Sequence, residues 1–509
     1  MSLGYKIKAV RDIKDNQFDC ILLISHNASE DDALPQEFKN AIEEAAAQDD
    51  QFDEISVHQM EFPAKCFFYS STGPISPEYD DVRCFTRAAR KGIARVLNSG
   101  LKAPLIVLGK YPPFPQSQLV SLLGVMEGLY VNLQYREDCP HRYPKVNMIG
   151  VHSPASQNIS KLISVAIALE TGRVVARDIG GSDPERMTPE RVEQYVNETF
   201  PAGGNVIIDV VCNEDTLNEE YPLFSAVNRG ASVIERHKGR IMYLTYEGSS
   251  VTDTLFIVGK GVTYDTGGAD IKVSGGMVGM CRDKCGAAAA AGFMKVVSML
   301  EPENLKVVAG LSLVRNSCGE NSYVADEIIT SRAGKRVRVV NTDAEGRMVM
   351  ADVLSYMKDI AKRSVNPHLF TIATLTGHAM RTVGAGYTIL MDNGPARVQS
   401  FSQQLQKSGE ILGDMFEIST IRKEDYDGYR GKTEGEDVVQ LVTLPPRGHQ
   451  GPAAFLIMAS GLDAHGLDST ESKLRYTHLE IAASAGEFPQ QATACPVLGL
   501  AANYLNIHT

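Results

Sequence analysis

The heptapeptide Asn-Thr-Asp-Ala-Glu-Gly-Arg at positions 341–347 constrains the fold of this chain more than any other segment. A mostly apolar run, 337–340, precedes it, and apolar residues at helical spacing follow it over 348–357. This pattern predicts a strand, a sharp turn and the start of a helix, with Asp343 and Glu345 at the carboxyl end of the strand. Ligands bind at that edge of open α/β sheets. Because buried charges must be paired or bind a metal, the two carboxylates indicate a site.

A second segment of the same character lies earlier in the chain. The apolar residues 255–258 predict a buried strand, and a glycine-rich stretch follows it. The stretch and the residues after it supply two lysines and two aspartates: Lys260, Asp265, Lys272 and Asp283. With the heptapeptide they offer enough hard oxygen ligands to hold two divalent ions that share a carboxylate. A lysine joins them as a ligand only when its amine is neutral, a state that neighbouring cations and desolvation favour.

Taken together, these motifs resemble the leucine aminopeptidase family, the two-metal cytosolic exopeptidases. The matching segments are the unbroken signature at 341–347, the second motif over Val258–Asp283, Ala-Thr-Leu-Thr-Gly at 373–377, and Arg177-Asp178 with Met187–Arg191. The resemblance covers the chain from Arg177 onward. Lys284, where an apolar residue is common, and the unusual segment 443–450 resemble a more divergent, aminopeptidase-like branch of the family.

The resemblance implies a set of metal ligands for two divalent ions, Zn²⁺ or Mn²⁺. The tight ion would be held by Lys260, Asp265, Asp283 and Glu345, and the exchangeable ion by Asp265, Asp343 and Glu345. Asp265 and Glu345 would then bridge the two ions, which would activate a water molecule to hydrolyse the first peptide bond.

The resemblance also implies roles for residues that do not bind metal. Lys272 would stay protonated and stabilise the oxyanion of the tetrahedral intermediate. Arg347, together with Leu375, would hold a bicarbonate ion that relays the proton, a task that suits the planar fork of a guanidinium. The first side-chain pocket would be lined by Met280, Thr374 and Gly377. An apolar N-terminal residue such as Leu or Met is therefore expected to be released from peptide substrates.

The fold class that we predict is α/β, with two domains that each contain a mixed sheet flanked by helices. Residues 1–175 form an N-terminal, macro-domain-like domain that ends in a long linker helix over 157–177, and residues 176–509 form the catalytic domain. Strands are expected at 20–24, 104–108, 146–151, 206–212, 241–247, 254–259, 306–313, 336–340 and 368–374. Helices are expected at 34–48, 80–99, 116–135, 188–200, 284–300, 347–362 and 493–506. Residues 423–451, rich in Gly, Pro and charge, are predicted to form a mobile loop.

Composition restricts the compartment and the partners. The net charge of −12 argues against a general affinity for nucleic acid or for anionic membranes. No apolar run reaches the ~18 residues of a membrane span, and the N-terminus lacks the apolar core of a signal peptide. Nine scattered cysteines favour a reducing compartment. We therefore expect a cytoplasmic protein, and the resemblance implies a homohexamer arranged as a dimer of trimers.

Several alternative interpretations were weighed against these predictions. A phosphate-binding loop at 259–268 is disfavoured because Lys260 precedes most of the glycines and Asp265 has the wrong charge. A metal-thiolate site at Cys281 and Cys285 lacks further ligands nearby. His378 is interpreted as a pocket-wall or interface residue rather than a base, and His478 as structural, in a strand where Glu480 replaces the family's usual Asp. At the level of function, the alternatives are another two-metal dipeptidase or amidase, and an inactive scaffold or nucleic-acid-binding relative.

Overall fold

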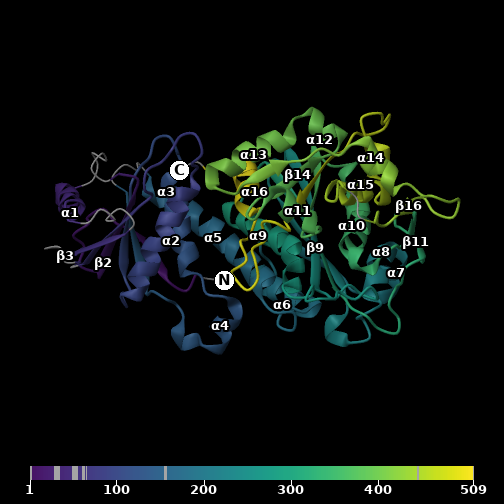
Figure 1. Cartoon of the computed structure of the whole chain (residues 1–509), viewed down its shortest axis with the longest axis horizontal. Helices are drawn as coiled ribbons and strands as arrows, with labels where there is room; N and C mark the ends of the chain where they lie inside the picture. Colours follow the sequence, from purple (N-terminus) through teal and green to yellow (C-terminus); the bar gives the residue numbers. More distant parts are fainter. Residues whose placement is uncertain are drawn as a thin grey trace. The chain divides into compact units, whose positions relative to one another are not determined.

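The computed structural model describes residues 3–27, 35–48, 55–59, 64, 66–153, 158–443 and 446–507 (Figure 1). The chain divides into two compact units. The first contains residues 1–171, 408–414 and 506–509, and the second contains 172–407 and 415–505. The long helix α5 (Ile159–Gly181), which the sequence predicted, begins in the first unit and ends in the second.

The first unit is built on a sheet in the order β1-β6-β5-β2-β4-β3, in which every pair is parallel except β3 with β4. Its strands are β1 (Lys6–Ala9), β2 (Cys20–Ser25), β3 (Ser56–Gln59), β4 (Cys66–Ser71), β5 (Pro104–Leu108) and β6 (Met148–His152). Its helices are α1 (Gln36–Ala46), α2 (Arg83–Asn98), α3 (Ser117–Leu129) and α4 (Leu133–Asp138). The single helix expected at 116–135 is therefore two helices, because α3 ends where Tyr130 turns the backbone to an extended conformation.

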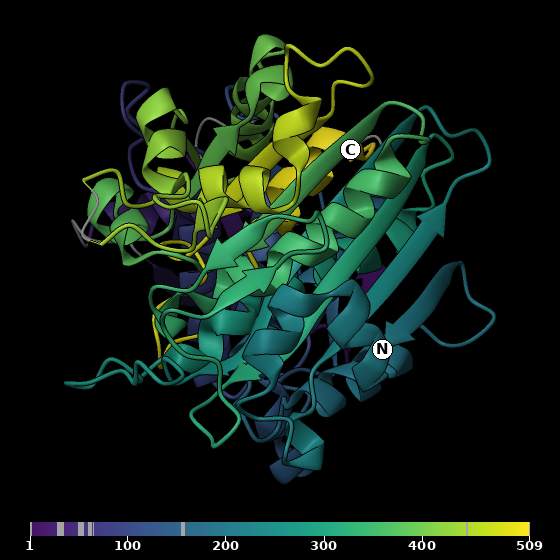
Figure 2. The same ribbon diagram turned by 90° about the vertical axis from the view of Figure 1, so that its right-hand side faces the viewer.

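The second unit contains a larger, twisted sheet (Figure 2). Its strand order is β15-β14-β17-β13-β9-β10-β8-β7. Its strands are β7 (Val206–Val211), β8 (Arg240–Glu247), β9 (Asp253–Asp265), β10 (Leu305–Asn316), β13 (Pro367–Ala373), β14 (Thr388–Asp392), β15 (Phe416–Ile418) and β17 (Arg475–Glu480). The four central strands, β17, β13, β9 and β10, are parallel, and antiparallel pairs flank them. Their carboxyl ends therefore meet at one edge of the sheet. Both units confirm the predicted α/β class with mixed sheets.

Helices α9 (Cys285–Leu300) and α10 (Glu345–Ala361) cover opposite faces of this sheet. Gly259 of β9 faces α9, since a Cβ there would lie 2.5 Å from the Cα of Ala287. Gly310 of β10 pairs with Val258 and faces α10, because a Cβ there would meet Met357 and Val353. The apolar side chains of α10 join a large cluster of buried apolar residues in this unit.

The other helices that lie wholly in the second unit are α6 (Pro189–Thr199), α7 (Glu214–Glu220), α8 (Pro222–Asn228), α11 (Gly377–Val383), α12 (Gly394–Val398), α14 (Lys423–Tyr429), α15 (Gln450–Ala459) and α16 (Val497–Tyr504). Helix α13 (Phe401–Leu412) begins in the second unit and ends in the first. Short 3₁₀ turns occur in the first unit at η1 (Pro140–Arg142) and in the second at η2 (Glu235–His237), η3 (Met280–Lys284), η4 (Thr342–Ala344) and η5 (Leu462–His465). Among the helices that the structure describes, none has the length and apolar character that crossing a bilayer requires.

Three predictions about the second unit were wrong in detail. The strand expected at 254–259 continues to Asp265, so the first half of the glycine-rich stretch is strand rather than loop. The strand expected at 336–340 is the shorter β12 (Arg336–Arg338), which pairs with β11 (Ile328–Thr330) and β16 (Val438–Val439) in a separate small sheet. The segment 423–451 contains α14 and β16, so it is not a single loop.

Candidate active site

Lys260 lies at the centre of a buried group of oxygen atoms. The extended strand β9 places it on the face that α10 covers, and its side chain is only 4% exposed. Its Nζ lies 2.7 Å from Asp283 Oδ1 and 2.9 Å from Glu345 Oε1. It also donates to the main-chain oxygen of Thr374 at 3.0 Å. Strand β9, turn η3, helix α10 and the residue after β13 therefore meet at one ammonium group.

Gly346 makes this approach possible. A Cβ at that position would lie 2.4 Å from Cε of Lys260, so the absence of a side chain at residue 346 leaves room for the lysine between β9 and the first turn of α10. Glu345, the first residue of α10, is thereby held against the lysine. This packing explains why a glycine directly follows Glu345 in the heptapeptide.

Lys272 connects the other two carboxylates. Its Nζ lies 2.9 Å from Asp265 Oδ2 and forms a second ion pair with Asp343. Asp265 ends β9, and Asp343 lies in the turn η4 immediately before α10. The intervening loop is tied to that turn, because Asp270 accepts the amide of Thr342 at 2.7 Å and its own amide donates to the hydroxyl of the same residue.

Three of the carboxylates could hold one ion between them. Ligand atoms of Asp265, Asp283 and Glu345 lie within 4.8 Å of one another, and all three residues are buried. Asp343 lies outside this group, with a side chain that is 38% exposed. The structure thus brings together all five residues that the sequence predicted as metal ligands, Lys260 and Asp343 included, although their roles as ligands remain predictions.

The crowding of like charges changes the protonation of these groups. Burial and the charge of Asp265 raise the pKa of Glu345 well above its usual value, and burial likewise raises the pKa of Asp283 and Asp343. For Lys260, burial acts to lower the pKa, but the adjacent carboxylates of Asp283 and Glu345 outweigh it and the pKa is raised. Excess negative charge in a buried site is the condition under which cations bind.

Sequence reasoning missed two residues that support this group. Asn316, at the end of β10, donates its amide to Asp265 Oδ1 at 2.8 Å. Tyr323 donates its hydroxyl to the main-chain oxygen of Thr342 at 2.8 Å. The strand predicted at 306–313 ended too early to place Asn316 at the edge where the four parallel strands meet. A search for polar residues at the ends of every central strand would have identified it.

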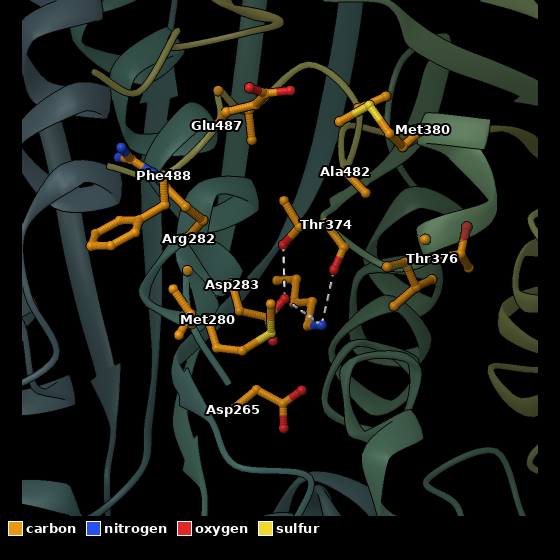
Figure 3. A pocket seen from close by; sticks show the side chains of 18 of the residues that line it. Asp265, Met280, Arg282, Asp283, Thr374, Thr376, Met380, Ala482, Glu487 and Phe488 are labelled. Atoms are coloured by element: carbon orange, nitrogen blue, oxygen red, sulfur yellow. Dashed lines mark hydrogen bonds and ion pairs between the residues drawn. The ribbon is translucent and has the colours of Figure 1, made fainter. Parts of the chain in front are cut away.

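A pocket of about 560 Å³ opens above the carboxylates (Figure 3). The predicted pocket residues Met280, Thr374 and Gly377 all line it. Asp265 lies at one end of the group of side chains in the figure, and Glu487 and Met380 lie at the other. The wall combines polar residues such as Arg282 and Thr376 with an apolar part formed by Met280, Val278, Met380, Ala482, Ala483 and Phe488. Thr374 joins the wall to the acidic group, since its hydroxyl donates to Asp283 Oδ1 at 2.8 Å.

The two residues predicted to hold bicarbonate are differently placed. Arg347 is buried and does not line the pocket, and its Nη1 donates to Tyr429 Oη and to the main-chain oxygen of Gln440, each at 3.0 Å. Leu375 does line the pocket, but its amide donates to Oε1 of the buried Glu480 at 2.9 Å.

The other residues singled out in the sequence lie outside the acidic group. His378 packs against Gly448, which has no side chain to displace the imidazole ring. His478 is fully buried in β17 and hydrogen-bonds the hydroxyl of Thr371 at 2.7 Å. Lys284 is buried and donates to the main-chain oxygens of Cys281 and Ser182 at 2.6 and 3.0 Å.

Comparison with known proteins found a family model that matches residues 174–501 and a relative that matches nearly the whole chain. The family model described as "Cytosol aminopeptidase family, catalytic domain" matches residues 174–501. A Caenorhabditis elegans protein named "Putative aminopeptidase W07G4.4" is 39% identical over 99% of each chain. A Campylobacter jejuni protein named "Probable cytosol aminopeptidase" is 31% identical over 65% of this chain and 67% of its own. The solved structure of the "Bottromycin maturation enzyme BotP in complex with Mn" has the same fold, with a TM-score of 0.77, 21% identity, and coverage of 96% of this chain and 99% of its own.

Proposed function

The chain belongs to the cytosol aminopeptidase family, and on that premise we propose that it is a metal-dependent exopeptidase that releases N-terminal residues from peptides. The observation that supports this proposal best is the buried group of Asp265, Asp283 and Glu345, because Asp265 and Asp283 line a pocket large enough for a side chain. Two lysines that also line the pocket pair with these carboxylates, and Lys260 is the less exposed of the two.

The residues present fit a pair of divalent ions. Asp265, Asp283, Asp343 and Glu345 carry four negative charges when ionised, against two positive charges on Lys260 and Lys272. Among the described residues, the buried Oδ2 of Asp283 has no hydrogen-bond partner, which is costly unless a cation binds it. Carboxylate oxygens suit Mn²⁺ and also bind Zn²⁺. The solved structure that shares this fold was obtained in complex with Mn.

Each of the predicted ligands would then have a defined task. Lys260, Asp265, Asp283 and Glu345 would hold the tight ion, and Asp265, Asp343 and Glu345 the exchangeable one. Lys260 must lose its proton to become a ligand, and the approach of cations favours that loss. Two ions held there would supply an activated water molecule and polarise the scissile carbonyl.

Lys272 has the position and charge of an oxyanion stabiliser. Burial acts to lower its pKa, but Asp265 and Asp343 outweigh this and the pKa is raised, so the amine keeps its proton. Its side chain is 16% exposed and lines the pocket, so its ammonium can reach a substrate carbonyl. A positioned cation stabilises the negative charge that develops on that oxygen in the transition state.

We propose that the apolar wall of the pocket selects the residue to be released. Met280, Met380 and Phe488 offer soft, apolar surface, and burying an apolar side chain there is favourable by roughly 25 cal/mol per Å². An N-terminal Leu or Met is therefore preferred. A homohexamer and a cytoplasmic location belong to the same proposal, because they are properties of the family that the sequence resembles.

Bicarbonate fits only half of the site predicted for it. Arg347 keeps a buried Nε without a partner among the described residues, which suits an anion. The amide of Leu375 is already bound by Glu480, so it offers nothing further to bicarbonate. We therefore propose Arg347 alone as the residue that would hold this ion.

Removing the metal tests the proposed function. Exhaustive chelation of the full chain should abolish release of Leu from Leu-amide, and Mn²⁺ or Zn²⁺ should restore it. A panel of other amino-acid amides, dipeptides and longer peptides, assayed in parallel, separates an aminopeptidase from a dipeptidase or an amidase. Hydrolysis that persists after elemental analysis has verified metal removal would show that the proposal is wrong.

A further inference from the structure

Asn316 is an uncharged residue whose side-chain amide reaches both carboxylates predicted to be shared by the two ions. It is completely buried. Its Nδ2 donates to Asp265 Oδ1 at 2.8 Å and lies 3.5 Å from Glu345 Oε2. The same nitrogen donates to the main-chain oxygen of Thr342 at 3.1 Å. One amide thus joins the end of β9, the turn η4 and the start of α10.

A local irregularity of the sheet places this amide. The register of β9 and β10 shifts between Val314 and Asn316, so that Asn316 pairs with Asp265. Gly268 leaves room beside it, because a Cβ there would lie 2.9 Å from Asn316 Oδ1. The backbone oxygen of Asn316 accepts the amide of Thr266 at 3.1 Å, which fixes the loop after β9 against the end of β10.

The chemistry of an amide suits this place better than that of a charged group. A lysine or arginine here would neutralise the carboxylates and compete with divalent ions, and an acid would add a further negative charge. An amide N–H orients a carboxylate without changing the net charge of the site. Residues that orient metal ligands in this way usually contribute tenfold to a hundredfold to metal affinity or activity.

We propose that Asn316 is a positioning residue that orients Asp265 and Glu345 so that both carboxylates can be shared by two ions. This inference rests on the proposed function, since it assigns to the same acidic group the residue that prepares it for metal. Asn316 does not line the pocket, so it acts through the carboxylates and not on the substrate.

The direct test is a metal titration of the full chain, made metal-free and competed against a chromophoric chelator with Mn²⁺ and Zn²⁺. Asn316→Leu keeps the size of the side chain and removes the donor, and it should weaken binding of at least one ion tenfold to a hundredfold. Raising the metal concentration should recover much of the hydrolysis of Leu-amide, because every ligand is still present. Asn316→Ala, which also removes the donor and adds no bulk, provides the same comparison if the leucine variant does not fold.

Tyr323→Phe is the matched control. It removes a hydrogen bond to the same Thr342 oxygen that Asn316 contacts, but within the described part of the chain Tyr323 hydrogen-bonds no carboxylate. Its metal affinity should stay within about threefold of wild type, well below the loss at a ligand-orienting residue.

If Tyr323→Phe loses as much affinity as the Asn316 variants, support of the turn explains the effect and the proposal is wrong. Wild-type affinity in the Asn316 variants refutes it as well, while leaving the proposed function intact. A wild-type chain that takes up neither ion overturns both.

Discussion

The two lysines of the site have different surroundings, which determines what each can do. Lys260 is enclosed by Asp283, Glu345 and the main-chain oxygen of Thr374, with its side chain 4% exposed. Lys272 lies on the loop that follows β9, and its side chain is 16% exposed. Both residues line the pocket, but Lys260 has three partners and lies among the carboxylates predicted to bind metal, which suits a ligand. The more exposed amine of Lys272 has freer access to a substrate that enters the pocket.

Replacing Lys272 tests this division of roles. Lys272→Ala should retain both ions yet reduce kcat by roughly two to three orders of magnitude, the effect of losing one oxyanion donor. KM should change less, because an interaction made mainly in the transition state appears in kcat. Steady-state kinetics and elemental analysis on the same preparation measure both effects. Loss of metal in proportion to loss of activity would identify Lys272 as a ligand or as support for one.

At the scale of elements, glycines set the distance between helix α9 and the sheet. Gly259 of β9 faces Ala287, and a Cβ on Gly286 would lie 2.0 Å from the main-chain oxygen of Ile372 in β13. The five consecutive alanines 287–291 keep the rest of the contact equally close. This packing fixes the preceding turn η3, and with it Asp283, beside Lys260.

A methyl group at position 259 should therefore disturb both stability and the site. Gly259→Ala places a Cβ 2.5 Å from the backbone of Ala287, and such overpacking typically costs about 1–3 kcal/mol. The urea midpoint should fall, and the metal content should fall with it as Asp283 moves. Gly466→Ala is the control, because the nearest atom to a Cβ there is 3.7 Å away and its φ is −76°. Equal midpoints for the two variants would show that α9 can shift without cost.

At the scale of the whole molecule, local pattern predicted most of the central strands and the acidic residues. Alternation of strand and helix patterns predicted the α/β class, and the spacing within 258–283 and 341–347 identified the carboxylates that meet. Long-range contacts decided the rest. A two-residue period cannot tell which sheet a strand joins, so the pattern at 336–340 did not indicate that β12 belongs to a separate small sheet. The composition of 423–451 favoured a loop, but Asp425 caps α14 and pairs with Arg447 at 2.8 Å, a contact between residues distant in sequence.

Buried histidines should make the whole fold sensitive to acid. Burial lowers the pKa of His478 to about 3 and that of His449 to about 4, and it lowers the pKa of His368 well below its usual value. An unfolded chain protonates its histidines near pH 6.5, whereas the folded chain keeps these three neutral. Between those values the unfolded state binds more protons, so stability is full above pH 6.5 and falls as the pH decreases. For each such histidine, the free energy of unfolding should be lower at pH 4.5 than at neutral pH by on the order of 2 kcal/mol.

Replacing one of these histidines isolates the effect. His478→Gln should reduce stability at pH 7.5, because a packed side chain is lost, but should also flatten the decline between pH 7 and pH 4.5. Urea unfolding of the metal-free chain measures this decline without a contribution from metal release. His141→Gln, at an exposed position, should leave the decline unchanged. A decline in His478→Gln as steep as that of wild type would mean that His478 accepts a proton in the folded state, and that its neutrality does not limit the stability of the molecule in acid.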